Sequence, residues 1–431
     1  MWSLGASALR AGPALAGTTL SPNPLARPTP IPGSERTLER LAEWSFLLLV
    51  AALPWTIAPM GITTALCAAA TLALWLRRGY GPPRTPVAWP TLTWFLALAL
   101  CAATALDRGA SLPRLTKAMF PLLVPLAADR ARLPRPGRRA LVVFLASAGL
   151  AALFGIVLYV LRGPGFPARA RGAVGHYMTF AGQLLIATSV AAGIAVCTRS
   201  ARWRWGALAV AATGAVALAA TYTRSSWLGL LAALATLLGL VRPRWLPALA
   251  GAVVLLLLLA PDSYRARAFS IVDPHDPTNL ERTYMWRAGA AMFRDHPVTG
   301  VGLEDLRPVY DRYKPPEARE RTGHLHSVPV QIAASMGSVG LVAFALLYGA
   351  LVITAARGLR RDLAAGGVAA GLRAGVVALL VGFLVAGLFE WNFGDEELLY
   401  PLFTLVGLAW AARDWEAAAR EAAVAAGREG R

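Results

Sequence analysis

The stretch RWLPALAGAVVLLLLLA, residues 244–260, decides the class of fold. After Arg244 it carries no charge and is long enough to cross a bilayer core, which takes roughly 17–25 helical residues. Similar apolar runs recur along most of the 431 residues, of which 56% are hydrophobic and only 15% charged. This composition is outside the range of soluble globular domains. We therefore predict an all-α, polytopic membrane protein.

We predict about twelve transmembrane helices joined mostly by short connections. Their ranges are 42–60, 61–76, 88–106, 115–128, 139–161, 177–197, 203–221, 225–241, 244–260, 327–355, 369–390 and 398–412. The fourth is short and is interrupted by Pro121 and Pro125, which remove backbone donors. The predicted order is an N-terminal segment (1–41), nine spans (42–260), a long loop (261–326), three spans (327–412) and a tail (413–431).

The net charge of +18 largely follows the predicted membrane topology. Basic residues gather after the even-numbered spans, as in the run from Arg130 to Arg139 behind the fourth span. By the positive-inside rule these connections, and both termini, are cytoplasmic. The charge is then explained without a nucleic-acid partner, and we predict none.

Basic residues on the opposite, outer side are exceptions to this rule. They lie in SLPRLTKAMF (111–120), in RARGAVGHYMTFAG (169–182), in TYTRSSWLGL (221–230), and in the long loop, where ten lysines and arginines occur. The charged residues of the first three places are Arg114, Lys117, Arg169, Arg171 and Arg224. Since topology does not require these charges, they are candidates for binding an anion.

Arg224 gives the sharpest single signal. It lies in a very short connection between two apolar spans, where an arginine is costly unless it is paired or solvated. Hydroxyl groups of the neighbouring Thr221, Thr223, Ser225 and Ser226 favour a polar pocket. The alternative interpretation is an interfacial arginine that snorkels to the headgroups.

The stretch NLERTYMWRAGAAMFRDHPVTGVG, residues 279–302, predicts a basic amphipathic helix closed by a Pro/Gly turn. Arg282, Trp286 and Phe293 lie on one helical stripe. We expect the helix to lie half-immersed on the outer membrane surface, with Arg282 turned toward an anionic group at headgroup depth. Arg287 lies on another face, where we expect water.

All five histidines fall on the predicted outer side, and His324 and His326 directly precede the tenth span. Histidine is the side chain best suited to proton transfer near neutral pH, so this pair predicts a general base. A metal site with ligands from Asp273, His275, Asp276 and the histidine pair is the competing interpretation. Neither HExxH nor CxxC spacing is present, and the chain has no phosphate loop or dinucleotide fingerprint. We predict no metal and no cofactor.

The acidic stretch EWNFGDEELLY, residues 390–400, forms the predicted outer loop between the last two spans. It either pairs with the basic loop or simply follows the topology, and the sequence leaves both interpretations open.

Three motifs in this order resemble the O-antigen ligase and O-antigen polymerase superfamily, integral-membrane glycosyltransferases of the bacterial inner membrane. One is an arginine after Ser or Thr at a short outer turn, matched by Arg224. Another is Arg-x-x-x-Trp followed by Pro-x-x-Gly-x-Gly, matched from Arg282 onward. The last is a histidine ahead of a Gly-x-x-Gly helix, matched by His326. A serine stands where the family commonly has asparagine after this histidine, so His324 remains an alternative.

The resemblance implies a lipopolysaccharide-biosynthesis enzyme of the cell envelope. It would move a glycan from an undecaprenyl-diphosphate carrier to lipid A–core at the periplasmic face, without a metal and with inversion. Arginines would hold the diphosphate, and a histidine would take the acceptor proton. The residues it implies in catalysis are His326, His324, Arg224 and Arg282. Those implied in diphosphate or substrate binding are Arg171, Lys117, Arg114, Trp286 and Arg287.

Two alternatives remain. A polymerase of the same superfamily would use a second lipid-linked glycan as acceptor; the twelve spans and the single dominant outer loop favour the ligase. A transporter of lipid-linked anions would need charges along a path through the spans. Instead the polar groups gather on one side. In each case membrane lipids are direct partners.

Overall fold

The computed structural model describes residues 33–303 and 305–415. Every regular element in these ranges is helical, and seven helices are long and apolar enough to cross a membrane. They are α2 (Ile57–Arg78), α6 (Pro134–Leu161), α7 (Tyr177–Cys197), α8 (Ala201–Ala220), α9 (Arg224–Val241), α14 (Val328–Ala356) and α16 (Val368–Gly387). This confirms an all-α, multi-pass membrane protein. Most of the predicted segment 1–41 and tail 413–431 lies outside the described residues.

Each of the twelve predicted spans falls on a helix, although the count of twelve crossings stays a prediction. Four further predicted spans fall on α1 (Gly33–Ala52), α3 (Ala88–Ala103), α10 (Leu246–Leu259) and α17 (Glu396–Ala412). The first helix begins nine residues before the predicted start at residue 42. The fourth span is a 3₁₀-helix, η1 (Leu112–Leu122), continued by α5 (Leu123–Arg130), with a proline inside η1 at Pro121.

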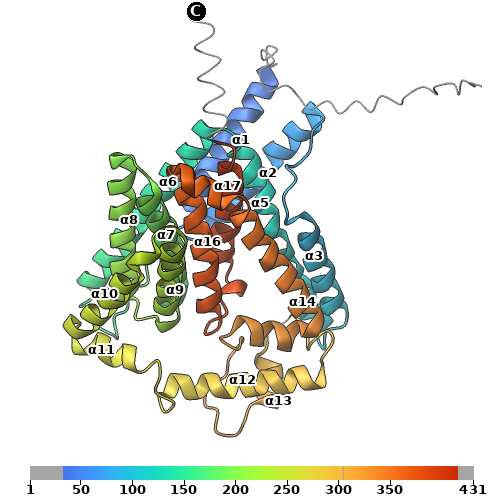
Figure 1. Cartoon of the computed structure of the whole chain (residues 1–431). Helices are drawn as coiled ribbons and strands as arrows, with labels where there is room; N and C mark the ends of the chain where they lie inside the picture. Colours follow the sequence, from blue (N-terminus) through green and yellow to red (C-terminus); the bar gives the residue numbers. More distant parts are fainter. Residues whose placement is uncertain (1–32, 304, 416–431) are drawn as a thin grey trace, which may run out of the picture.

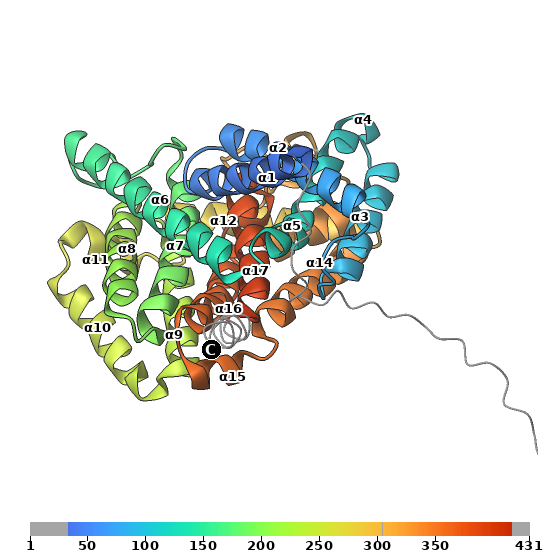
Figure 2. The same cartoon turned by 90° about the horizontal axis from the view of Figure 1, so that it is seen from above.

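The centre of the bundle is held by close helix–helix contacts at glycines. Helix α16 packs against α7 and also against α9 (Figure 2). At each of these two crossings both helices carry a glycine. A Cβ atom on Gly193 would lie 2.4 Å from the carbonyl oxygen of Gly371, and one on Gly382 would lie 2.4 Å from that of Gly229. Small residues permit such backbone approach between membrane helices, and dispersion contacts then stabilise the pair.

The long predicted loop crosses one end of the bundle. Helices α11 (Asp262–Phe269), α12 (Pro277–Asp295) and α13 (Arg307–Tyr313) lie at the end opposite the marked C-terminus in Figure 1. We call this the outer end. The remaining short helices are α4 (Arg108–Ser111), η2 (Pro243–Trp245), α15 (Leu359–Ala365) and η3 (Asn392–Gly394).

The expected amphipathic helix exists as α12, and one of its faces is covered by protein. Met285, Ala288 and Met292 are buried in one hydrophobic cluster. The cluster also contains Leu306, which directly precedes α13, and Tyr310, which lies in α13. The buried residues adjoin the predicted stripe, whose Arg282, Trp286 and Phe293 are half-buried and whose fourth member, Gly289, is buried. Protein from α13 and from the segment before α14 covers the buried face, and the half-immersion of the helix stays a prediction.

The Pro/Gly turn after α12 docks into a break in α14. At Gly337 the backbone of α14 leaves the helical region, with φ 60° and ψ −155°. The amide of Ser338 donates to the carbonyl of Pro297 at 2.8 Å, and that of Val301 donates to the carbonyl of Ala334 at 2.9 Å. The turn thus pairs with backbone groups at the break. This joint fixes α12 against the start of α14, and both carry residues of the candidate site.

Candidate active site

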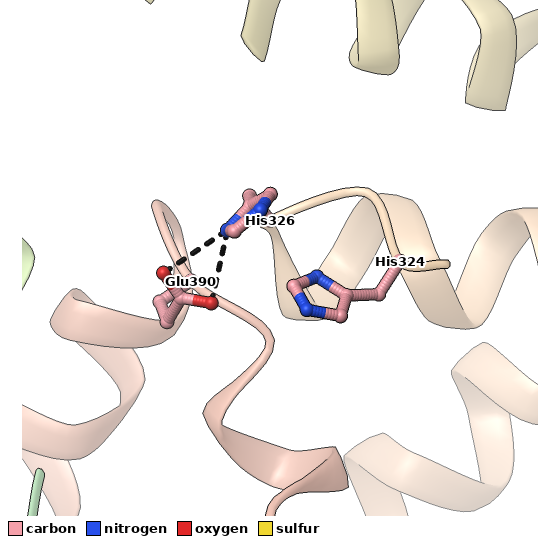
Figure 3. Close-up of side chains that lie close together, drawn as sticks. All are labelled: His324, His326 and Glu390. Atoms are coloured by element: carbon pink, nitrogen blue, oxygen red, sulfur yellow. Dashed lines mark hydrogen bonds and ion pairs between the residues drawn. The ribbon is translucent and has the colours of Figure 1, made fainter. Parts of the chain in front are cut away.

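His326 and Glu390 form the centre of the candidate site. The Nδ1 atom of His326 lies 3.0 Å and 3.1 Å from the two carboxylate oxygens of Glu390, as Figure 3 shows. Burial alone would raise the pKa of Glu390. The hydrogen bond and charge of His326, together with Arg282, lower it to about 2. An ionised carboxylate only accepts hydrogen bonds, so Nδ1 donates, and in the neutral form of the ring Nε2 then carries the lone pair. This is the tautomer that a general base needs.

The segment that carries His326, residues 322–327, is held in a strained conformation; we call it the histidine strap. His326 has a positive φ of 45°, which costs a residue with a side chain roughly 1–3 kcal/mol. Two contacts hold the strap. Leu325 donates its amide to Gln331 Oε1 at 2.8 Å and accepts a bond from Trp286 Nε1 at 3.2 Å. Trp286 thus supports the strap and lies outside the cavities described below.

Arg282 approaches the same carboxylate from α12. Its guanidinium lies 3.6 Å from Glu390 Oε2, and its side chain is 11% exposed. Burial lowers the pKa of Arg282, and the charge of Glu390 offsets this in part. Glu390 is therefore shared between a cation and the imidazole, and it connects α12 to the strap.

Arg224, the first residue of α9, is buried and fully engaged by the loop. Its Nη1 donates to the carbonyl and hydroxyl of Ser270 at 2.7 Å and 2.8 Å, and its Nη2 donates to Asn279 Oδ1 at 2.8 Å. Asp276 completes the set at 3.2 Å. The partners of Arg224 are thus not the neighbouring hydroxyl groups, and the snorkelling alternative does not hold.

Four arginines line one cavity of about 220 Å³, which we call the arginine cavity. They are Arg169, Arg224, Arg267 and Arg282, and Glu281, Glu320 and His326 share the wall. Arg169 stacks on the rings of Phe166 and Tyr177, with its guanidinium carbon 3.9 Å and 4.4 Å from their centres.

The arginines that line the arginine cavity are partly buried and repel one another. Burial, and then the charges of Arg224 and Arg169, lowers the pKa of Arg267 to about 10. Burial also lowers the pKa of Arg169. Such shifts mark groups whose charge is incompletely compensated. An anion with several oxygens would relieve this repulsion and accept forked hydrogen bonds.

A second cavity of about 470 Å³ lies beside the first, and we call it the histidine cavity. Its wall includes Tyr177, Ser225, His324, His326 and Glu390. Because His326 and Tyr177 line both cavities, the two spaces meet at the imidazole. The volume is within the usual range for a small-ligand site.

His324 lies against His326 on the strap, with ring centres 4.3 Å apart. Burial, and then the neighbouring His326, lowers the pKa of His324 to about 4. It is therefore neutral at neutral pH, and its buried Nδ1 has no hydrogen-bond partner among the residues that the structure describes. This environment suits an uncharged structural or substrate contact better than a protonated group.

The other predicted residues divide between the wall of a third cavity and the surface. Arg114 and Lys117 line a separate cavity, described below. Arg171 and Arg287 are exposed and line none of these three cavities. The structure therefore brings Arg224, Arg282, His324 and His326 together, and it places Arg169 and Arg267 where Arg171 was expected.

Glu390 is the important residue that sequence reasoning did not assign. Its only sequence signal is an acidic residue at the start of an outer loop, and its partner His326 is 64 positions away. Arg267 had no distinguishing signal among the ten basic residues of the long loop. Both are identified by the tertiary structure alone.

One group of residues in the described ranges has the composition of a metal site. Ligand atoms of His324, His326 and Glu390 lie within 4.8 Å of one another. Asp273 and His275, also considered as metal ligands, are not part of this group. They are exposed and pair with each other at 3.7 Å.

Comparison with known sequences gives one match. Residues 207–345, about a third of the chain, match the family described as O-antigen ligase. This range contains Arg224, Arg282 and both strap histidines and ends before Glu390. No curated protein matches the chain. The match supports the superfamily indicated by the motifs, a family of glycosyltransferase-type enzymes that act on lipid-linked glycans.

Proposed function

We propose that the chain is an O-antigen ligase, because residues 207–345 match the family described as O-antigen ligase and contain the arginine and histidine motifs. It transfers a glycan from undecaprenyl diphosphate to lipid A–core at the periplasmic face of the bacterial inner membrane. One observation carries this proposal. The arginine cavity and the histidine cavity share His326, so an anion site directly adjoins a base.

The donor diphosphate binds in the arginine cavity. Neither Arg169 nor Arg267 forms an ion pair within the described part of the chain, so their donors are available to phosphate oxygens. Arg282 lies at the boundary with His326. These guanidinium groups stabilise the negative charge that grows on the diphosphate as it leaves. Arg224 acts mainly by holding α11 and α12 in place.

His326 is the general base. Its Nε2 takes the proton of an acceptor hydroxyl, and the hydroxyl oxygen attacks the anomeric carbon opposite the diphosphate. The bond from that carbon to the diphosphate oxygen breaks, and its electron pair leaves with the diphosphate. The configuration at the anomeric carbon is inverted. The ionised Glu390 stabilises the imidazolium that forms, as a carboxylate does for histidine bases in general.

The topology follows from this chemistry. The outer end, including the loop 261–326, faces the periplasm, and both termini lie in the cytoplasm. The basic residues at the end of the bundle that carries α15 agree with the positive-inside rule. A polymerase of the same superfamily differs only in its acceptor, which is a second lipid-linked glycan.

The test is a transfer assay with purified protein in nanodiscs, a lipid-diphosphate-linked glycan, and lipid A–core or a second lipid-linked glycan as acceptor. We expect product on lipid A–core, unchanged by a chelator, and a loss of about 10²–10⁴-fold in His326→Ala. Arg224→Ala and Arg282→Ala also lose transfer. Arg294→Gln, on the exposed face of α12, is the matched control.

Each other outcome points elsewhere. Elongation of the lipid-linked glycan would make the chain a polymerase. Loss of transfer in chelator, restored by one divalent metal, would assign His324, His326 and Glu390 to a metal site. No transfer to either acceptor by folded protein would contradict the proposal and favour transport.

A further inference from the structure

A third cavity at the outer end, of about 300 Å³, takes no part in the chemistry above. We call it the Lys117 cavity. Arg114 and Lys117 come from η1, Arg307 opens α13, and His324 comes from the strap. The lining also includes Trp94 of α3 and Gln331 of α14. Helices α3 and α14 lie on the opposite side of the bundle from α9 and α11, which contribute Arg224 and Arg267 to the arginine cavity (Figure 2).

The Lys117 cavity has more positive charge than its carboxylates neutralise. Lys117 donates to the carbonyl of Gly394 at 2.6 Å, which uses one of its three N–H donors. Arg114 makes no ion pair within the part of the chain that the structure describes. Arg307 pairs with Asp305 at 3.4 Å, and Asp305 is the one carboxylate among the described residues of the lining.

Three further carboxylates lie within electrostatic reach of Lys117, and none of them lines the Lys117 cavity. Asp395 faces the histidine cavity and accepts a hydrogen bond from Thr179 at 2.7 Å. Glu396 lines an apolar groove beside α2, and Glu397 donates its amide to Asp395 at 3.2 Å. Among the described residues, the lining itself keeps three cations against one carboxylate, which suits an anionic group.

The opposite wall of the Lys117 cavity is aromatic. Trp94, Trp391 and Phe393 line it, and the rings of Trp94 and Phe393 meet edge to face with centres 5.9 Å apart. Rigid aromatic rings offer a flat apolar surface for the carbon face of a sugar, while the cations hold its charged substituents. The combination fits a saccharide that carries phosphate.

The three cavities form a series with a histidine at each boundary. His326 lines the arginine and histidine cavities, and His324 lines the histidine and Lys117 cavities. The anion site next to the base is the arginine cavity, which the proposed function gives to the donor. A second anion site, on the far side of the strap, therefore belongs to the other substrate.

We infer that the Lys117 cavity binds a phosphorylated saccharide of the acceptor, so that donor and acceptor approach the histidine strap from opposite sides. This inference rests on the proposed transfer reaction. It assigns Arg114 and Lys117 to the acceptor, whereas the sequence alone named them only as candidates for diphosphate or substrate binding. It also gives a role to the second histidine, His324, which lines both the histidine cavity and the Lys117 cavity.

The first test measures KM for each substrate separately in Arg114→Gln and Lys117→Gln. We expect the KM for lipid A–core to rise at least 10-fold, with the KM for the lipid-linked donor changed less than 2-fold. An acceptor stripped of its core phosphates should bind wild type and variants equally weakly. Arg294→Gln should leave both constants unchanged. A rise in the donor KM, or no change in the acceptor KM, would overturn the inference.

A second readout does not depend on turnover. A fluorescent phosphorylated core oligosaccharide is titrated onto the inactive His326→Ala protein in nanodiscs, with and without Lys117→Gln. We expect at least a 10-fold weaker Kd in the double variant. Binding that Lys117→Gln leaves unchanged would contradict the inference even if transfer had failed for another reason. If Lys117→Gln instead weakens only the retention of phosphatidylglycerol, the cavity holds a lipid headgroup, and the acceptor assignment falls.

Both substitutions spare the fold on structural grounds. Arg114 is exposed and makes no ion pair with a described residue, and glutamine at position 117 can still donate to the Gly394 carbonyl. The thermal midpoint of each variant, compared with wild type, checks this. If Lys117→Gln unfolds, Arg114→Gln alone decides the question.

Discussion

Buried or half-buried arginines occur at both ends of the bundle, and the two ends differ in what neutralises them. At the end that carries α1, Arg130 pairs with the adjacent Asp129 and lies 3.4 Å from Glu39. Arg78 lies 3.3 Å from Glu35 and 3.0 Å from the same Glu39. Each of these cations is matched by carboxylates of the protein, so no ligand is needed there.

At the outer end Arg224 pairs with Asp276, but two other arginines of the same cavity have no such partner among the described residues. Arg169 and Arg267 both lie over the ring of Phe166, and Arg267 also donates to the carbonyl of Tyr222. Neither forms an ion pair with a described carboxylate. Arg282 shares Glu390 with His326. Desolvating an unpaired charge is costly, so such an arrangement persists when a ligand supplies the missing negative charge. The contrast separates structural arginines from ligand-binding ones, and four experiments can test it.

The largest effect is expected for the double variant Arg169→Gln/Arg267→Gln. Removing two donors to the leaving diphosphate should lower kcat/KM for the donor by about 10²–10³-fold. The thermal midpoint should stay the same or rise, because like charges that repel each other are removed. Measurement of both quantities on one preparation checks this. Normal transfer, or strong destabilisation, would show that these arginines are structural.

The opposite result is expected for Arg130→Gln. This change leaves Asp129 buried without its main cation, and breaking a buried pair typically costs about 3–5 kcal/mol. Unfolding in detergent should reveal the loss, while kcat per folded molecule stays unchanged. The more exposed Arg78→Gln should cost less. A folded Arg130→Gln protein with impaired transfer would argue against the division between the two ends.

A smaller effect concerns acid stability. Because the pKa of His324 falls from 6.5 to about 4 on folding, only the unfolded chain binds this proton between those values. Stability should therefore fall as the pH drops from 6.5 to 4, by up to about 3 kcal/mol. His324→Asn should flatten this part of the profile of thermal midpoint against pH. The exposed His275→Asn serves as the control and should retain the fall.

The smallest effect is expected from inorganic diphosphate without metal. If the arginine cavity lacks an anion, diphosphate at ten times its Kd should stabilise wild type by about 1.4 kcal/mol. A thermal-shift titration measures this, and Arg169→Gln/Arg267→Gln should abolish it. Stabilisation of equal size in that variant would place the binding elsewhere, for example on the basic surface at the other end.

Local sequence signals predicted the features that depend on local physics. Hydropathy located helices such as α16, and the charge pattern singled out Arg224 and Arg282 as unusual. The pairing of His326 with Glu390 was beyond such reasoning, because nothing in either segment encodes a contact across 64 positions. The contact of the buried α12 face with the neighbouring short helix α13 could not be predicted for a similar reason.

The joint between the turn after α12 and the break in α14 restricts how this protein can vary. A Cβ atom on Gly300 would lie 2.3 Å from the carbonyl carbon of Ser335, and one on Gly337 would lie 2.4 Å from that of Val298. Both glycines also have positive φ. When two side chains clash, a second substitution can relieve the first by shortening a neighbour. Here the obstructing atoms are main-chain atoms, so no single second-site suppressor can restore the space. A suppressor screen that starts from Gly300→Ala or Gly337→Ala should return only true revertants.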